Sequence, residues 1–241
     1  ETPLRRRKFT GQGLAALFLG LSAALGARAQ GQSQGLLAQL SPQDATAGLK
    51  LALERGATAA VALLGRPDGF LGDPKVRIPL PPALDPYAGM LRALGQQRRL
   101  DDLVTSMNRA AEAAVPEAKA LLLNAVKTMS VADARQILTG GDTSVTDFFA
   151  DRTRLPLGER FLPIVTRETQ RVRLARQYND LAGRAAKFGL VREENAQIEG
   201  YVTTKALDGL YFMIGEEERK IRKDPVGTGS DLLRKVFGSL R

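Results

Sequence analysis

The 241-residue chain contains no cysteine, no histidine and no tryptophan. Without cysteine the protein has no disulfide, no thiol nucleophile and no lipobox cysteine for a lipid anchor. Without histidine it lacks the commonest general base and the commonest transition-metal ligand. These absences exclude Ser-His-Asp and Cys-His catalysis, zinc hydrolysis and haem ligation by histidine. Carboxylate, lysine or tyrosine chemistry remains open, as does a hard cation held by oxygen ligands, but we expect no metal site and no cofactor.

Aromatic residues are also scarce, at 5%, whereas hydrophobic residues make up 44% and charged residues 25% of the chain. This balance is that of a globular protein with a core of small and medium side chains. The formal net charge is +9, but five basic residues and one acidic residue lie in residues 1–29, so the remainder carries +5. That mild excess favours an anionic surface or an envelope protein as partner. Nucleic acid is disfavoured because no aromatic residues interleave the basic ones.

Residues 1–29 have the three parts of an export signal. A basic stretch, Arg5–Lys8, precedes an apolar stretch, Leu14–Leu25, that is too short to cross a bilayer comfortably. Ala27 and Ala29 form an A-x-A cleavage site, which makes Gln30 the first residue of the mature protein. The sequence therefore predicts a periplasmic protein whose signal peptide is cleaved.

Arg6 and Arg7 resemble the core of a twin-arginine signal. The alternatives to a twin-arginine signal are an ordinary secretory signal and a membrane anchor. The anchor is less favoured, because no stop-transfer pattern follows. Residues 30–36 form a polar linker that we expect to be flexible, and residues 37–241 form the domain. No other segment approaches about 20 apolar residues, so we expect no transmembrane segment in the mature chain.

Apolar residues recur at helical spacing along the domain, which predicts a single all-α domain of roughly eight or nine helices. Near residues 74–86 the prolines predict an extended segment that packs on the helices. Pro116 should kink a long helix or start a new one. The expected helices cover residues 41–64, 85–95, 99–129, 130–139, 144–153, 157–189 with an interruption at Pro163, 196–223 and 230–240.

Two carboxylates lie in the most apolar of these helices. Asp208 sits inside the apolar stretch Ala206–Ile214, and Glu217 falls on the apolar stripe of the same helix. A buried carboxylate needs a cation, a donor or a proton. We expect Asp208 to be largely buried and paired with Lys205 or Arg109, and Glu217 to lie nearer the edge of the core. Structural ion pairs are commoner than active sites, so we favour the structural interpretation over acid–base catalysis.

A second polar group consists of Asn108 and Glu112, which are one helical turn apart, and Arg109 beside them. We slightly favour a surface pair over a cluster that faces Asp208 or Glu217. The arginine run and the Gly-Gly pair each have a structural and a functional interpretation, and we favour the structural one for both. The arginines between residues 167 and 176 form a solvated face or a site for anions, and Gly140-Gly141 is a helix stop or an anion cradle.

Several longer stretches resemble one bacterial family, called domain of unknown function 4197. They are LSPQDATAGLKLAL, VRIPLPPAL, MNRAAEAAVPEAK, ILTGG, YVTTKALDGLYFMIGEEERKIRKDP and LLRKVFG. The resemblance implies an exported helical domain with no established activity. The polar positions of the family appear here as Asn108, Arg109, Glu112, Lys205, Asp208, Glu217 and Arg222. Gly227-Thr228-Gly229 departs from the Arg-Thr-Thr that is usual in the family, so any contact of that arginine is missing here.

The sequence therefore favours a non-catalytic binding or structural module of the cell envelope. One alternative is a carboxylate-dependent hydrolase that uses Asp208, Glu217 and Glu112. The other is a carrier of apolar ligands, which would need a dry cavity on the order of several hundred cubic ångströms.

Overall fold

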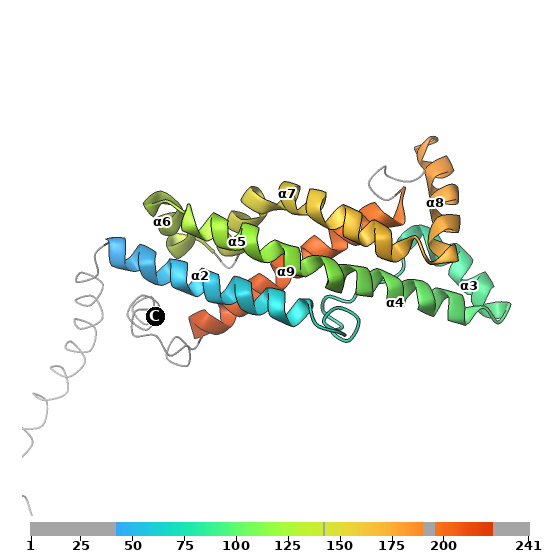
Figure 1. Cartoon of the computed structure of the whole chain (residues 1–241), viewed down its shortest axis with the longest axis horizontal. Coiled ribbons are helices and arrows are strands. Elements are labelled where there is room, and N and C mark those ends of the chain that lie inside the picture. The colour runs from blue at the N-terminus through green and yellow to red at the C-terminus, as the bar shows by residue number, and fades with distance from the viewer. Residues whose placement is uncertain (1–41, 142, 190–195, 224–241) are drawn as a thin grey trace, which may run out of the picture.

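The computed structural model describes residues 42–141, 143–189 and 196–223. Within these ranges the protein is all-α and has no strand, as the sequence predicted (Figure 1). The α-helices are α2 (Pro42–Leu64), α3 (Asp85–Ala93), α4 (Gln97–Ala114), α5 (Ala118–Lys127), α6 (Val131–Thr139), α7 (Ser144–Thr169), α8 (Arg173–Ala186) and α9 (Ile198–Lys223). Two 3₁₀ turns, η1 (Pro82–Leu84) and η2 (Val115–Glu117), complete the described elements.

A kinked rod formed by α4, η2 and α5 runs along much of the molecule (Figure 1). The kink falls at Pro116, where the missing N–H and the ring prevent a regular α-helical turn, as expected. With this rod counted once, the described residues contain seven helical rods, slightly fewer than the eight or nine expected. Ser130 begins α6 with a capping box that it forms with Asp133.

Helix α7 is longer than the sequence predicted. The expectation of two helices with an interruption at Pro163 is wrong, because α7 continues through both Pro156 and Pro163. Each proline removes one backbone donor, but the residues four positions earlier, Arg152 and Glu159, are exposed, so water can reach their carbonyls. Packing of α7 on α4 and α9 holds the helix together across these sites.

Helix α9 is the central helix, as expected, and packs on α7, α2 and α4. Its stretch from Ala206 to Ile214 is almost entirely buried. Gly209 allows the helix to approach the loop that follows α2, since a Cβ at this position would lie 2.7 Å from Cε1 of the buried Phe70. Close contact with the loop therefore depends on the absence of a side chain at residue 209.

The proline-rich segment is extended over a shorter range than expected. Residues 77–81 have no regular structure and make no ladder, so this is an arm packed on helices and not an edge strand. Turns precede it, and η1 and the start of α3 replace its predicted end at residues 82–86. Val76 and Ile78 point into the core.

Several predictions concern residues outside the described ranges. They are the export signal with Arg6, Arg7, Ala27, Ala29 and Gln30, the linker 30–36, the helix start at Ser41, the helix 230–240 and the side chain of Arg222. In the described part of the chain, no helix is both long and apolar enough to span a bilayer.

Candidate functional site

Asn108 is buried on α4, where its side chain binds the extended arm. Its Oδ1 accepts the N–H of Ile78 at 2.8 Å, and its Nδ2 donates to the carbonyl of Ile78 at 2.9 Å. Nδ2 also donates to the carbonyl of Val104 at 2.8 Å. One amide thus supplies both hydrogen bonds that a strand partner would give to Ile78. Asn108 is a backbone clamp for the arm.

Glu112, one turn later, is buried as well and binds the loop before the arm. Its Oε1 accepts the N–H groups of Phe70 and Leu71 at 3.0 and 3.1 Å. Its Oε2 pairs with Arg109 at 2.6 Å, and Arg109 in turn pairs with Asp68 at 2.7 Å. Hydrogen bonds to these carboxylates raise the pKa of the Arg109 guanidinium. The favoured surface pair describes this group only in part: Arg109 and Glu112 do pair on one helix, but Glu112 is buried and its other partners, Phe70 and Leu71, lie about forty residues away in sequence.

Asp208 is not buried, which contradicts the sequence-based expectation. Its side chain is 44% exposed and pairs with Arg154 of α7 at 2.9 Å, and more distantly with Lys205 at 3.9 Å. The pairing with Lys205 was expected, whereas pairing with Arg109 was wrong. The reason is geometric: the exposed residues of this part of α9 lie three or four positions apart and form a narrow strip in water. They are Thr204, Lys205, Asp208 and Phe212.

Glu217 lies near the edge of the core, as expected, with 14% of its side chain exposed, and it pairs with Lys220 at 2.6 Å. It is nine residues from Asp208 on the same helix, an axial separation of roughly 13 Å. Paired carboxylates in glycosidases are about 5–9.5 Å apart, so these two do not form such a pair. Among the described residues, no three Asp or Glu side chains gather in a way that could hold a metal ion.

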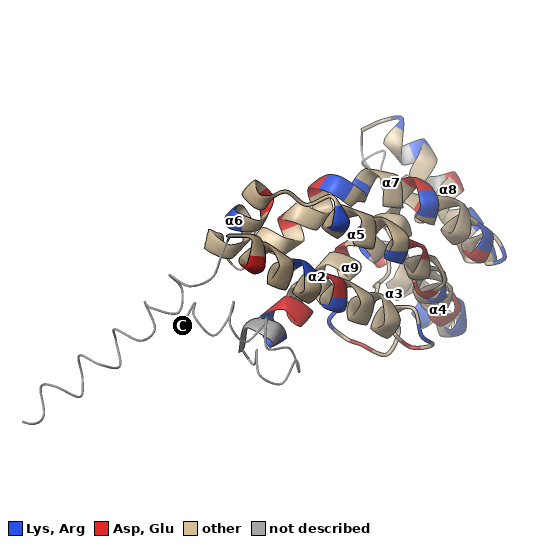
Figure 2. Cartoon of the chain, turned by 60° about the vertical axis from the view of Figure 1, so that its left-hand side comes forward, with Lys and Arg blue, Asp and Glu red and all other residues tan. Residues whose placement is uncertain are grey.

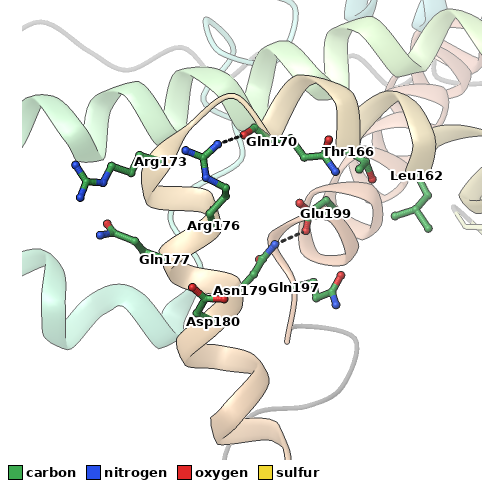
Figure 3. A pocket seen from close by; sticks show the side chains of 10 residues that line it. All are labelled: Leu162, Thr166, Gln170, Arg173, Arg176, Gln177, Asn179, Asp180, Gln197 and Glu199. Atoms are coloured by element: carbon green, nitrogen blue, oxygen red, sulfur yellow. Dashed lines mark hydrogen bonds between the residues drawn. The ribbon is translucent and has the colours of Figure 1, made fainter.

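A groove that the sequence does not predict lies where α8 meets the end of α7 and the start of α9 (Figure 3). It has a volume of about 840 Å³ and is open to solvent on one side. Hydrogen-bonding side chains dominate its walls. The lining residues are Leu162, Thr166, Gln170, Arg173, Arg176, Gln177, Asn179, Asp180, Gln197 and Glu199.

Asn179 joins the two helices that form the groove. Its Nδ2 donates to Oε2 of the buried Glu199 at 2.9 Å, and its Oδ1 accepts the N–H of Ile198 at 2.8 Å (Figure 3). The first turn of α9 has N–H groups without helical partners, so Asn179 acts as a cap provided by another helix. On the same helix as Asn179, Arg176 donates to the carbonyl of Gln170, just after the end of α7, at 2.7 Å.

Other side chains of the groove have no partner in the part of the chain that the structure describes. Arg173 and the side-chain amides of Gln170, Gln177 and Gln197 make no hydrogen bond or ion pair with the residues that the structure describes. Their donors and acceptors are therefore available to a ligand. The sequence signal for this groove is the arginine run ending at Arg176, for which the sequence favours a solvated face.

The groove continues along α8 into a second hollow of about 720 Å³. The two hollows share Leu162, Asn179, Asp180 and Gln197, and the second adds Arg184 and Lys187 to the lining. Figure 2 shows basic bands on α7 and α8, with acidic residues interspersed over the molecule. We name the combined feature the α8 groove.

An apolar pocket between α2, α7 and α9 is far smaller. It is lined mainly by Leu49, Leu53, Val145 and Ile214, and its volume of about 10 Å³ is that of a single water molecule. An apolar ligand of ordinary size does not fit there.

Comparison with known proteins gives one match. A family model described as "Protein of unknown function (DUF4197)" matches residues 39–238. No curated protein and no solved structure matches the chain.

Proposed function

The chain belongs to the DUF4197 family of proteins of unknown function, and we propose that it is a non-catalytic binding module of the bacterial cell envelope whose ligand site is the α8 groove. The observation that carries this proposal is the set of polar side chains in the groove that have no hydrogen-bond or ion-pair partner among residues 42–141, 143–189 and 196–223. Unpartnered donors and acceptors that converge on a hollow are typical of binding sites.

The contacts of the three candidate catalytic carboxylates support a binding function over a hydrolase. Glu112 uses both oxygens to hold backbone N–H groups and Arg109. Asp208 and Glu217 are each paired with a cation and lie in none of the hollows described above. A general acid needs a proton and a general base needs a free lone pair close to the substrate, which this arrangement does not provide. The apolar pocket between α2, α7 and α9, at about 10 Å³, is too small for the carrier alternative.

The envelope location rests on the export signal of residues 1–29. N-terminal sequencing of protein from a periplasmic fraction should begin at Gln30. Replacing Arg6-Arg7 by Lys-Lys should block export through the twin-arginine route. Normal export of this variant would leave the general secretory route, whereas retention of the wild-type protein in the cytoplasm would contradict the location.

Binding is tested by co-sedimentation of residues 30–241 with purified cell-wall sacculi and, separately, with envelope membrane vesicles. We expect one of these fractions to retain the protein, and Arg173→Gln combined with Gln177→Ala to reduce retention. The matched control is Arg135→Gln, which removes one positive charge from an exposed side chain of α6, at the other end of the molecule (Figure 1). Equal retention of the groove variant and the control would refute the groove as the ligand site.

A further inference from the structure

The charged residues that α8 contributes to the groove follow a regular order along the helix, and Glu199 of α9, which accepts from Asn179, is the remaining charged residue of the lining. Arg173 and Arg176 lie at the first end of α8, Asp180 in the middle, and Arg184 and Lys187 at its second end. At 100° per residue these five positions fall within about 80° of one another around the helix axis. They therefore form one stripe that is basic, then acidic, then basic. Arg173 and Arg184 are separated by roughly 16 Å along the axis.

This order excludes several classes of anionic ligand. A single phosphate group would engage only one of the two basic pairs, because the pairs are more than a helical turn apart, and the other pair would stay unused. A nucleic acid or a bilayer presents a continuous row or sheet of negative charge, and Asp180 would oppose it at the centre. A bilayer would also meet a convex surface more readily than a hollow. The stripe instead fits an elongated ligand with separated anionic groups.

The side chains between the two basic ends of the groove determine which chemical groups the ligand should carry between its anionic groups. Gln177 and Gln197 present amides that both donate and accept, and Asp180 accepts only. Hydroxyl groups both donate and accept, so they can bind all three side chains. Small residues, Gly183, Ala196 and Gly200, leave room beside them in the second hollow.

We propose that the α8 groove binds an acidic glycan chain, with carboxylates of the glycan on Arg173 and Arg184 and its hydroxyls on the amides between them. This inference rests on the proposed function and specifies the ligand class. The arginines hold carboxylates by charge-assisted hydrogen bonds, and the volume of about 840 Å³ in the first hollow is large enough for several linked rings. Exposed ionic contacts of this kind weaken as salt concentration rises.

The test is isothermal titration calorimetry of residues 30–241 with tetragalacturonic acid. Its fully methyl-esterified form is the neutral control, and inorganic phosphate is the control for a simple anion. We expect the acid to bind and both controls to bind at least about tenfold more weakly, since a charge-assisted hydrogen bond is worth about a factor of ten or more. Arg173→Gln and Arg184→Gln should each weaken binding of the acid by about tenfold. Arg135→Gln should leave it within about twofold, because α6 is remote from the groove.

Three results would overturn the inference: equal binding of the ester and the acid, equal binding of phosphate, or no binding of the acid. Failure of this inference differs from failure of the proposed function. If no glycan binds but co-sedimentation with an envelope fraction still depends on Arg173, the groove is a site for another ligand class. If co-sedimentation is also independent of Arg173, both proposals are wrong.

Discussion

Replacing Asn108 by leucine tests whether the buried amide holds the extended arm. Leucine has nearly the same size, so no large cavity forms, but the N–H and the carbonyl of Ile78 lose their partners at 2.8 and 2.9 Å. Each unsatisfied buried group costs about 1–3 kcal/mol. The carbonyl of Val104 also loses a bond, but its position four residues earlier on α4 leaves it the helical N–H of residue 108.

The two backbone groups together predict a cost of about 2–6 kcal/mol. The more apolar side chain of leucine offsets part of this by favouring burial, and the arm can shift to admit water. We therefore expect a net loss of about 2–4 kcal/mol in the free energy of unfolding, which is a large share of the 5–15 kcal/mol of a typical domain. The matched control is Ser106→Ala on the same helix, which removes one partly buried bond to the carbonyl of Glu168 and should cost about 0.5–1.5 kcal/mol.

The assay is urea denaturation, with linear extrapolation of the free energy of unfolding to water. Amide hydrogen exchange at Ile78 gives a local reading, because its N–H should be protected in the wild type and should exchange faster in the Asn108→Leu variant. A loss of less than about 0.5 kcal/mol, together with unchanged protection of Ile78, would refute the clamp, since it would leave two buried groups without measurable cost.

Three further predictions follow from packing, exposure and ionisation. Gly209→Ala should destabilise the protein by about 1–3 kcal/mol in urea unfolding, because the new Cβ would meet Phe70. The control Gly158→Ala, whose Cβ would lie 3.9 Å from its nearest neighbour, should stabilise by about 0.5–1 kcal/mol. Similar changes in unfolding free energy for the two variants would contradict the close approach at residue 209. Asp208→Asn should cost at most about 1 kcal/mol in thermal unfolding, since its ion pairs are exposed, and a loss above about 2 kcal/mol would contradict that exposure. Burial raises the pKa of Tyr201 to about 12, so the folded protein keeps a proton that the unfolded chain loses near pH 10. The free energy of unfolding should therefore fall as the pH rises from about 10 to 12. Absorbance titration of the phenolate alongside circular dichroism measures this, and an unchanged alkaline midpoint in Tyr201→Phe would contradict it.

Local sequence signals predicted much of the fold. The helical spacing of apolar residues predicted the all-α class, Pro116 predicted the kink, and Ser130 predicted the start of α6. These features depend on residues within one or two turns of each other, which a single sequence displays. The continuity of α7 through Pro163 did not follow, because neighbouring helices stabilise it and local propensity does not record them.

The partners of the candidate polar residues Asn108 and Glu112 were harder to predict because these contacts are long-range. Asn108 and Ile78 are thirty residues apart, and Glu112 and Phe70 are forty-two apart, so their sequence spacing carries no signal of contact. Asp208 was misplaced for a different reason. An apolar stretch was interpreted as buried on every side, although residues four apart can leave a strip one side chain wide in water.

The buried polar residues that hold the arm are connected to the polar residues that line the α8 groove. Asn108 fixes Ile78 in the arm, and the next residue, Pro79, accepts the hydroxyl hydrogen of Tyr201 at 3.2 Å. Tyr201 lies in the first turn of α9, whose residues Ile198 and Glu199 bind Asn179 of α8. The clamp therefore supports the wall of the α8 groove through hydrogen bonds that the backbone of the arm and of the first turn of α9 connects. Weaker ligand binding in a clamp variant would report altered groove geometry and would not identify Asn108 as a ligand contact, which is why exposed arginines such as Arg173 are the residues that test binding.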